Sequence, residues 1–244
     1  MTLLVIDKVS KHFGSLVAVS DASLDIGEKE IVGLIGPNGS GKSTLLHAIC
    51  GRTFATSGSI HLDGIDVTAL SPQQRAKLGM AIKFQLARIY LEKTVRENIL
   101  ISLQAGESIW SQLRSKSLKD FQRKIIEIAE EFQLNEQLDQ LAKSLSHGQQ
   151  QWLEIAMAMA VDPALLLLDE PTAGMSPKER ADTAVLIKKA SQRCGVLIVE
   201  HDLDFIKELC NRISVLHQGR IVATGTPLEI ENSPAVREVY LTRV

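Results

Sequence analysis

A glycine-rich loop near the start of the chain restricts the possible folds more than any other feature. Residues 36–44 read GPNGSGKST and match the pattern G-x-x-x-x-G-K-[ST]. An apolar run, Ile31–Ile35, precedes the loop, and an apolar segment ending at Ile49 follows it. Only glycine lets such a loop curl so that successive backbone N–H groups point inward at phosphate oxygens. The pattern therefore predicts a strand, a phosphate-binding loop and a helix.

The positions of this loop have distinct predicted roles. Lys42 is expected to reach the β- and γ-phosphates of a nucleotide, and the Ser43 hydroxyl is expected to ligate Mg²⁺. A glycine turn without a ligand is the alternative, which the strand before the loop and the helix after it disfavour. The other positions expected to contact the nucleotide are Gly36, Pro37, Asn38, Gly39, Ser40, Gly41 and Thr44.

A second apolar run, Leu165–Leu168, ends in the two carboxylates Asp169 and Glu170. At the carboxyl end of a buried strand, Asp169 is expected to face the phosphate-binding loop and to hold Mg²⁺ through water. Glu170 is placed to polarise an attacking water molecule. An acidic pair after an apolar run is often an ordinary strand end. The glycine-rich loop in the same chain favours the catalytic interpretation.

The rest of the chain alternates between strand-like and helix-like segments, which implies a parallel sheet with right-handed crossovers. Residues 88–160 have a different, helical character and are predicted to be an insertion between two parts of the sheet. No repeat or linker interrupts the chain, so residues 1–244 are expected to form one domain. The expected strands are 3–6, 22–26, 31–35, 59–62, 165–168, 196–199 and 213–216, and the expected helices outside the insertion lie near 177–191 and 203–209.

Composition excludes several classes of function. The net charge of the 244 residues is −2 and no segment is strongly basic, so a nucleic-acid partner is not expected. No apolar run approaches the roughly 18 residues that span a bilayer, and charged residues come too early for a secretory signal. The three cysteines lack the spacing of metal ligands and are interpreted as small buried hydrophobes in a reducing compartment. Any membrane role is therefore expected to come through a partner.

The segment Leu145–Gln149, with the sequence LSHGQ, decides between the classes of nucleotide hydrolase. It resembles the LSGGQ signature of ABC-type ATPases, and the resemblance covers essentially the whole chain. It implies an α/β P-loop fold with a mostly parallel core sheet, an N-terminal antiparallel β subdomain and an inserted helical subdomain. Phe13 resembles the aromatic residue that stacks on adenine, Gln85 the glutamine that senses Mg²⁺ and water, and His201 the histidine near the γ-phosphate.

The resemblance also implies how ATP and Mg²⁺ are bound. The signature of one chain, Ser146, His147, Gly148 and Gln149, closes the nucleotide site of a second chain, so that two ATP molecules lie between two subunits. A small residue and a glycine at a helix N-terminus suit this task, because they expose backbone N–H groups and a hydroxyl to an anion. Hydrolysis would then open the dimer, since ATP contacts both subunits only when it is closed.

The sequence departs from the family pattern in two places. His147 stands where the family has the first glycine of the signature, and we expect it either to tolerate or to assist the γ-phosphate. Met175 and Ser176 stand near the position of a leucine-aspartate pair, which removes the carboxylate of a contact across the dimer.

Short stretches around the signature, 200–202, 215–219 and the C-terminus resemble the branch of urea and branched-chain amino-acid importers. That branch implies two membrane-spanning permease subunits, an indirectly coupled solute-binding protein, and a homodimer or a heterodimer with a second ABC ATPase. The chain would then lie peripherally on the cytoplasmic face of the plasma (inner) membrane. The segment Leu86–Val95 is expected either to line the permease contact or to belong to the core.

Three other functions remain open from the sequence. The first is an export motor such as the ATPase of lipopolysaccharide transport. The second is an ABC ATPase outside transport, for example in cofactor-cluster assembly, which co-purification with integral membrane proteins would distinguish. The third, a regulator that binds nucleotide without hydrolysing it, is disfavoured because both Glu170 and His201 are present.

Overall fold

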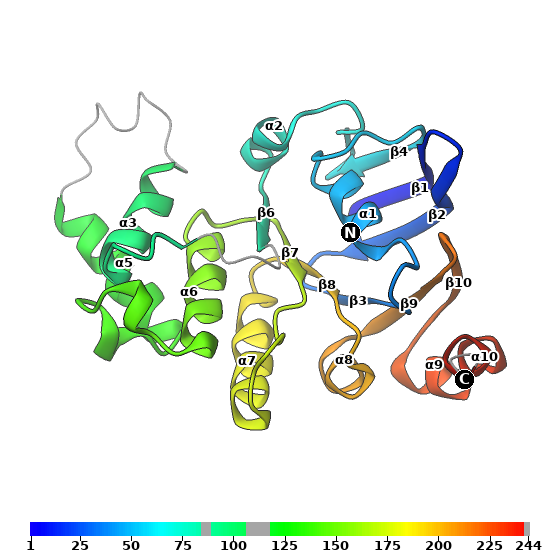
Figure 1. Cartoon of the computed structure of the whole chain (residues 1–244). Helices are drawn as coiled ribbons and strands as arrows, with labels where there is room; N and C mark the ends of the chain where they lie inside the picture. The colour runs from blue at the N-terminus through cyan, green and yellow to red at the C-terminus, as the bar shows by residue number, and fades with distance from the viewer. Residues whose placement is uncertain (84–88, 106–117, 242–244) are drawn as a thin grey trace. The chain divides into compact units, whose positions relative to one another are not determined.

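The computed structural model describes residues 1–83, 89–105 and 118–241 (Figure 1). It consists of two compact units. The sheet unit comprises Met1–Ile82, Ala164–Glu170 and Ser191–Val244, and the helical unit comprises Lys83–Pro163 and Pro171–Ala190. The helical unit thus spans the whole predicted insertion, 88–160, together with a later segment that the sequence did not assign to it. The grouping of all 244 residues into one domain stays a prediction.

The sheet unit is built on a six-stranded sheet with the order β10-β9-β3-β8-β7-β6. β3 pairs in parallel with both β8 and β9, and β7 pairs in parallel with β8, as the strand-helix alternation predicted. Every residue of β3, β7 and β8 is buried, which explains why these strands are continuous apolar runs in the sequence. The bounds are β3 (Ile31–Ile35), β6 (Met80–Lys83), β7 (Leu165–Asp169), β8 (Gly195–Val199), β9 (Arg212–His217) and β10 (Arg220–Gly225).

A second, antiparallel sheet has the order β2-β1-β4-β5 and contains the N-terminal hairpin. The two hairpin strands are much longer than the alternation at 3–6 and 22–26 predicted. Their far ends are mostly exposed and several register shifts interrupt the pairing, so the alternating pattern is lost there. The bounds are β1 (Thr2–Phe13), β2 (Leu16–Gly27), β4 (Ser57–Leu62) and β5 (Ile65–Asp66).

Helix α1 connects the two sheets, since it contacts β1 and β2 of the antiparallel sheet and β8 of the parallel one. Helix α8 contacts β3, and α9 packs on β9 and β10. All three cysteines are buried, as predicted, and burial raises the pKa of the Cys210 thiol to about 12. The helices of this unit are α1 (Lys42–Ile49), α2 (Pro72–Lys77), α8 (Leu203–Leu209), α9 (Pro227–Asn232) and α10 (Pro234–Leu241).

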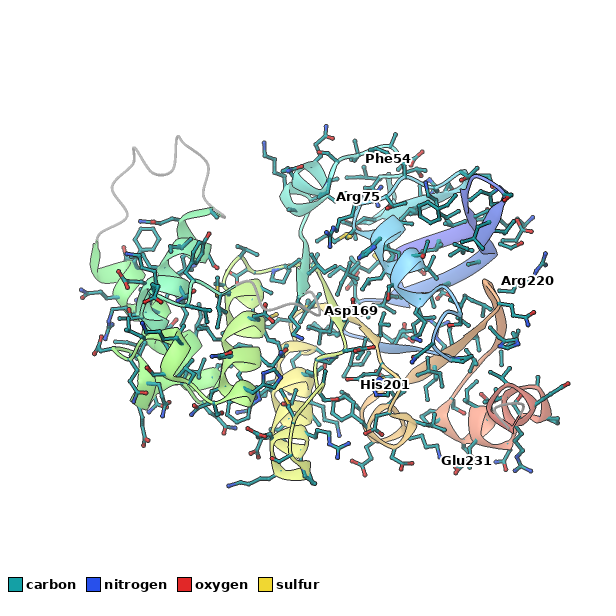
Figure 2. All side chains as sticks on the ribbon, viewed as in Figure 1. Phe54, Arg75, Asp169, His201, Arg220 and Glu231 are labelled. Atoms are coloured by element: carbon teal, nitrogen blue, oxygen red, sulfur yellow. The ribbon has the colours of Figure 1, made fainter. Side chains whose placement is uncertain are left out.

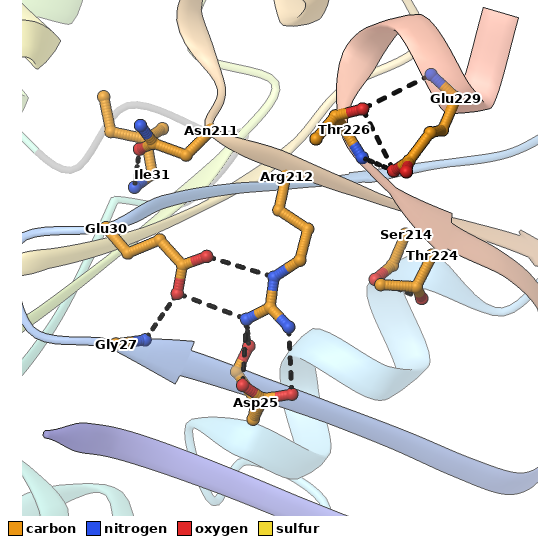
Figure 3. A network of polar contacts seen from close by, with 10 residues as sticks. All are labelled: Asp25, Gly27, Glu30, Ile31, Asn211, Arg212, Ser214, Thr224, Thr226 and Glu229. Atoms are coloured by element: carbon orange, nitrogen blue, oxygen red, sulfur yellow. Dashed lines mark hydrogen bonds and ion pairs between the residues drawn. The ribbon is translucent and has the colours of Figure 1, made fainter.

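A polar network also links the two sheets (Figure 3). The guanidinium of Arg212 in β9 donates to both carboxylate oxygens and to the backbone carbonyl of Asp25 in β2. Its Nε also donates to Oε1 of Glu30 at 3.0 Å. Nearby, the side chain of Asn211 accepts from the backbone N–H of Ile31 at 2.8 Å. The start of β9 is therefore anchored both to β3 and to the antiparallel sheet.

In the helical unit, α3 contacts α5 and α6, and α6 contacts α7. The apolar residues Ile125 and Ile128 form a buried face of α5, and Phe132, just beyond the end of that helix, is buried as well. No helix within the described ranges is both long enough and apolar enough to cross a membrane. The elements are α3 (Val95–Ala105), α5 (Leu118–Glu131), the short 3-10 turns Asn135–Gln137 and Ala142–Ser144, α6 (His147–Met159) and α7 (Pro177–Ala190).

Candidate functional site

The glycine-rich loop joins the carboxyl end of β3 to the start of α1, as predicted. Gly36, Gly39 and Gly41 have φ angles of +152°, +79° and +105°, which side chains disfavour. Gly36 also lies so close to the Leu216 carbonyl that a Cβ atom would overlap it. A Cβ atom on Gly41 would overlap the Ala18 carbonyl in the same way. The glycines are therefore required by the curl of the loop and by the strands packed against it.

The side chains of the loop are suited to bind an anion. Lys42 is buried, and its Nζ donates to the carbonyls of Gly36 at 2.7 Å and Pro37 at 3.1 Å. Asn38 in the loop and Ser43 at the start of α1 are exposed. The buried hydroxyl of Ser40 has no hydrogen-bond partner within the described protein. A cationic side chain, the exposed hydroxyl of Ser43 and the N-terminus of α1 thus meet at a loop whose shape fits a phosphate chain.

The paired carboxylates lie at the same edge of the sheet as the glycine-rich loop. In the parallel register Asp169 of β7 is opposite Val199 of β8, and Val199 is opposite Leu34 of β3. Asp169, labelled in Figure 2, is 5% exposed and ends its strand. Because parallel strands bring their carboxyl ends to one edge, the topology gathers segments that are more than a hundred residues apart in the sequence.

Glu170 has an unusual backbone. Its φ of +45° lies in the left-handed region, which costs energy for a residue with a side chain. Its N–H donates to the Val199 carbonyl at 2.8 Å, so the pairing of β7 with β8 extends by one residue and holds this geometry. The side chain is 23% exposed, so a carboxylate stands at the strand end within reach of solvent. Strained backbone of this kind is typical of functional positions.

His201 faces two carboxylates at the end of β8 (Figure 2 labels this residue). Its Nδ1 lies 3.7 Å from Glu170 Oε1 and 3.7 Å from Glu200 Oε2. The imidazole is 61% exposed, whereas the Glu200 side chain is only 1% exposed. Glu200 Oε2 also accepts the backbone N–H of His201 at 3.1 Å. The buried Glu200 therefore holds the backbone of His201, whereas the side chains of Glu170 and His201 both reach solvent.

Phe13 ends β1 at the tip of the N-terminal hairpin. Its side chain is 49% exposed, so Phe13 is not a core residue. The Nζ of Lys11 lies 5.0 Å from the centre of the Phe13 ring, in cation–π range. The ring therefore has a free face and is compatible with stacking on a base.

Two residues that support this site were not predicted from the sequence. The first is Gly219, in the turn between β9 and β10, whose N–H donates to the Ser40 carbonyl at 2.8 Å and whose carbonyl accepts from Ser20 N–H at 2.8 Å. Its φ is +79°, next to Gln218 at +47°. A Gln-Gly pair between two apolar runs is a turn signal and could have located the turn, but not its contact with the loop.

The second is Arg75 of α2, labelled in Figure 2 and 1% exposed. Its guanidinium donates to the carbonyls of Ala48 and Ile49 at the end of α1. It also donates to the carbonyls of Thr68 and Leu70. A cation at a helix C-terminus satisfies carbonyls that have no partner within the helix and complements the helix dipole. Arg75 thus fixes the far end of the helix that begins with Lys42.

The signature lies in the helical unit, at the start of α6. Ser146 is the N-cap residue, and its hydroxyl accepts the N–H of Gln149 at 3.2 Å. The Gln149 side chain accepts the N–H of Ser146 at 3.0 Å, which completes a capping box. The N–H groups of His147 and Gly148 are the first of the helix and have no partner inside it. Ser146 and His147 are exposed, whereas Gly148 is buried and the carboxylate of Glu179 lies beside this helix start.

The second departure from the family pattern has a local structural role. Ser176 forms a capping box with Glu179 at the start of α7, where its N–H and hydroxyl donate to Glu179 Oε2 at 2.9 and 2.8 Å. These bonds, led by the backbone N–H of Ser176, lower the pKa of Glu179. Met175 is 8% exposed, and its sulfur accepts the hydroxyl of Thr183 at 3.2 Å. Both replacements are therefore integrated into the fold of the helical unit.

Gln85, predicted to contact Mg²⁺ and water, lies outside the described residues, as do positions 86–88. Of the remaining part of the expected permease contact, Ile89 is 9% exposed, whereas Tyr90 and Leu91 are 52% and 48% exposed. Ile89 is thus core, and the two following apolar residues are surface.

The loop, the carboxylate pair and the histidine at one edge of a parallel sheet define a nucleotide hydrolase of the P-loop class. Comparisons with known proteins specify the family. The family profile described as "ABC transporter" matches residues 19–173. The chain is 36% identical to the lipopolysaccharide export system ATP-binding protein LptB of Haemophilus influenzae, over 99% of this chain and 98% of that protein.

Another relative is the high-affinity branched-chain amino acid transport ATP-binding protein LivG of Salmonella typhimurium. It is 37% identical, over 98% of this chain and 97% of that protein. Among solved structures, the ADP conformation of MJ1267, an ATP-binding cassette of an ABC transporter, matches with a TM-score of 0.87 at 30% identity and covers 99% of both chains. The dimeric ATP-binding cassette MJ0796 bound to ADP and Pi matches with a TM-score of 0.80 at 26% identity, over 92% of this chain and 99% of that one.

The chain belongs to the ABC transporter family, as an ATP-binding subunit. The resemblance inferred from the signature is thereby confirmed, and so is the predicted fold. The protein is an ATPase of a transporter.

Proposed function

We propose that this chain is the ATP-hydrolysing motor of an importer for urea or for branched-chain or related amino acids. The motor role rests on one observation above all, the common sheet edge that bears the phosphate-binding loop, Asp169, Glu170 and His201. The similarity to LivG, which is named for branched-chain amino acid transport, supports import of amino acids. Urea is supported by the short sequence stretches around the signature and in the C-terminal third.

In this proposal residues of one chain bind and position ATP. Phe13 stacks on adenine, and residues 36–44 surround the phosphates with backbone N–H groups. Lys42 moves from the carbonyls of Gly36 and Pro37 to the β- and γ-phosphates. Bound Mg²⁺ would neutralise charge on the phosphates, and Ser43, Gln85 and Asp169 would hold it. The exposed Ser43 hydroxyl and the buried Asp169 carboxylate are ligands that this ion prefers.

Two residues act on the transferred phosphoryl group. Glu170 orients the attacking water and accepts its proton, and His201 stabilises the γ-phosphoryl group in the transition state. Glu200 accepts the backbone N–H of His201 and so fixes the backbone from which the imidazole extends. Most of the rate is expected from positioning and electrostatics, because phosphoryl transfer needs little covalent chemistry from the protein.

The site is completed by a second chain. Ser146, Gln149 and the free backbone N–H groups of His147 and Gly148 would contact the γ-phosphate bound to the partner. The second chain is either another copy or a second ABC ATPase. Two permease subunits would contact the exposed Tyr90 and Leu91, with a solute-binding protein acting indirectly. The complex would place this chain on the cytoplasmic face of the plasma (inner) membrane, and membrane fractionation tests that location.

Lipopolysaccharide export is the second candidate, because LptB is similar over nearly the full length of both chains. A role in cofactor-cluster assembly has no comparable observation in its favour.

Uptake in source cells that lack this chain tests the proposal. Cells would be rescued with the wild type or with Glu170→Gln and supplied with labelled urea or labelled leucine. We expect that uptake of one of the two is lost and that only the wild type restores it. Loss of urea uptake would identify a urea importer, and loss of leucine uptake an amino-acid importer. Unchanged uptake of both would contradict import and favour export of lipopolysaccharide.

A further inference from the structure

The histidine that replaces the first signature glycine is engaged within its own chain. Nε2 of His147 lies 2.9 Å from the backbone carbonyl of Ala173, in the loop 171–176 that leads from β7 to α7. A carbonyl can only accept, so Nε2 must carry the hydrogen. Both the neutral ring with the proton on Nε2 and the doubly protonated ring can make this bond. The contact joins two segments 26 residues apart in the sequence.

The loop is shaped to receive the imidazole. Gly174 has a φ of +74°, and a Cβ atom there would lie 3.2 Å from Nε2 and 3.3 Å from Cδ2 of His147. The backbone therefore passes directly beside the ring at a position that favours glycine. The next residue of the signature makes a second close contact. A Cβ atom on Gly148 would lie 2.5 Å from Oε1 of Glu179, so the Glu179 side chain of α7 packs directly against the start of α6.

A third link lies deeper in the same unit. The indole N–H of Trp152 in α6 donates to the Thr183 hydroxyl in α7 at 2.8 Å, and that hydroxyl lies 2.7 Å from the Glu179 carbonyl and 3.2 Å from the Met175 sulfur of the loop. These residues are buried, whereas His147 is exposed. α6 and α7 therefore stay together without His147. The histidine lies at the surface and restrains only the loop 171–176.

We propose that His147 is a positioning residue that holds the loop 171–176 against the start of α6 through the Nε2–H bond to Ala173. The signature and the segment that directly follows the catalytic carboxylates thus move together. In this role the imidazole does not act on a phosphate; the signature offers the partner nucleotide the Ser146 hydroxyl and backbone N–H groups instead. The kinetic part of this inference rests on the proposed motor function, and the structural part does not.

Three substitutions at position 147 distinguish the effect of the N–H donor from the effect of the imidazole ring. His147→Gln keeps an N–H donor of similar reach but cannot titrate, His147→Leu keeps bulk without a donor, and His147→Gly restores the usual residue of the family. Hydrogen exchange of the full chain would report on the backbone of residues 171–176. We expect exchange about 2- to 10-fold faster with Leu and Gly, the effect of losing one hydrogen bond, and near-wild-type exchange with Gln. Equal exchange in all variants, or equally fast exchange with Gln and Leu, would overturn the proposal.

ATP hydrolysis by the same purified proteins gives an independent readout. We expect the Leu and Gly variants to lose about 2- to 10-fold in kcat with little change in KM, because the loop lies outside the phosphate-binding loop. The Gln variant should recover kcat and share the wild-type pH profile. A pH profile that differs between wild type and Gln would show that the ring acts through its own charge, against a positioning role for residue 147. The charged group that faces it is Glu179. A wild type without ATPase activity would contradict the proposed function. Hydrogen exchange would still show whether His147 holds the loop 171–176.

Discussion

At the scale of single residues, the chemistry depends on which of two neighbouring carboxylates acts. Glu170 and Glu200 lie at the same distance from Nδ1 of His201, but only Glu170 reaches solvent. We predict that Glu170→Gln lowers kcat by about 100-fold or more, the usual contribution of a general base, while ATP still binds. Glu200→Gln should lose much less activity and show its effect mainly as a lower melting temperature. Rapid turnover by Glu170→Gln would refute its role as the base.

Nucleotide affinity depends on an aromatic residue at the hairpin tip. Phe13→Ala should weaken ATP binding by about 5- to 100-fold, the usual worth of stacking on one base, without loss of stability, because the ring is half exposed. Phe54→Ala is a matched control, since this ring is 53% exposed on the same unit. Titration with a fluorescent ATP analogue measures both. If the two variants bind alike, Phe13 does not stack on adenine.

At the scale of elements, a buried cation fixes the helix that carries Lys42. Arg75→Met would remove a donor from four backbone carbonyls, of which that of Ala48 keeps the N–H of Gly51, and we expect a loss of about 3 kcal/mol in the free energy of unfolding. Lys77→Met, at an exposed position of the same helix, should change stability little. Denaturation by urea compares the two. A similar small loss in both variants would show that the carbonyls find other partners.

The link between the sheets predicts a dependence on pH. Hydrogen bonds from Arg212 lower the pKa of Asp25 below its ordinary value of 3.8. A lowered carboxyl pKa stabilises the folded chain above 3.8, and this contribution disappears as the pH falls through the lowered value. Arg212→Gln should therefore cost about 0.5–1 kcal/mol near neutral pH and less in acid. Unfolding curves at several pH values test this, and a difference that grows in acid would contradict it.

Many of the strands, helices and loops could be predicted from the sequence. Completely buried strands such as β7 are short apolar runs, and the loop at 36–44 has a pattern that few folds share. The contacts that brace the site could not be predicted, because they join distant segments through the backbone. Arg75 binds carbonyls, which have no sequence signature, and the Ser40–Gly219 contact spans most of the chain. In the far half of the β1–β2 hairpin most side chains are exposed. Buried and exposed residues therefore do not alternate there, and the sequence carries no strand pattern.

At the scale of the whole molecule, the proposed composite site can be tested by complementation. Lys42→Ala removes the phosphate contact of one chain, and Ser146→Arg blocks the signature that it offers to its partner. We expect each variant to be inactive alone and the mixture to recover part of the ATPase activity, since a mixed dimer contains one intact composite site. No recovery would contradict a site formed by two copies of this chain and would favour a second ATPase as the partner.

The order of strands has a consequence for how the protein is made. β3 lies between β8 and β9, yet these neighbours follow it by about 160 and about 180 residues in the chain. While the ribosome is still synthesising the middle of the protein, β3 is an apolar strand with both edges unpaired, which favours aggregation. Folding of the central sheet must await the last third of the polypeptide, so a truncated product would expose this strand. We therefore expect chaperones to bind the nascent chain until synthesis is nearly complete.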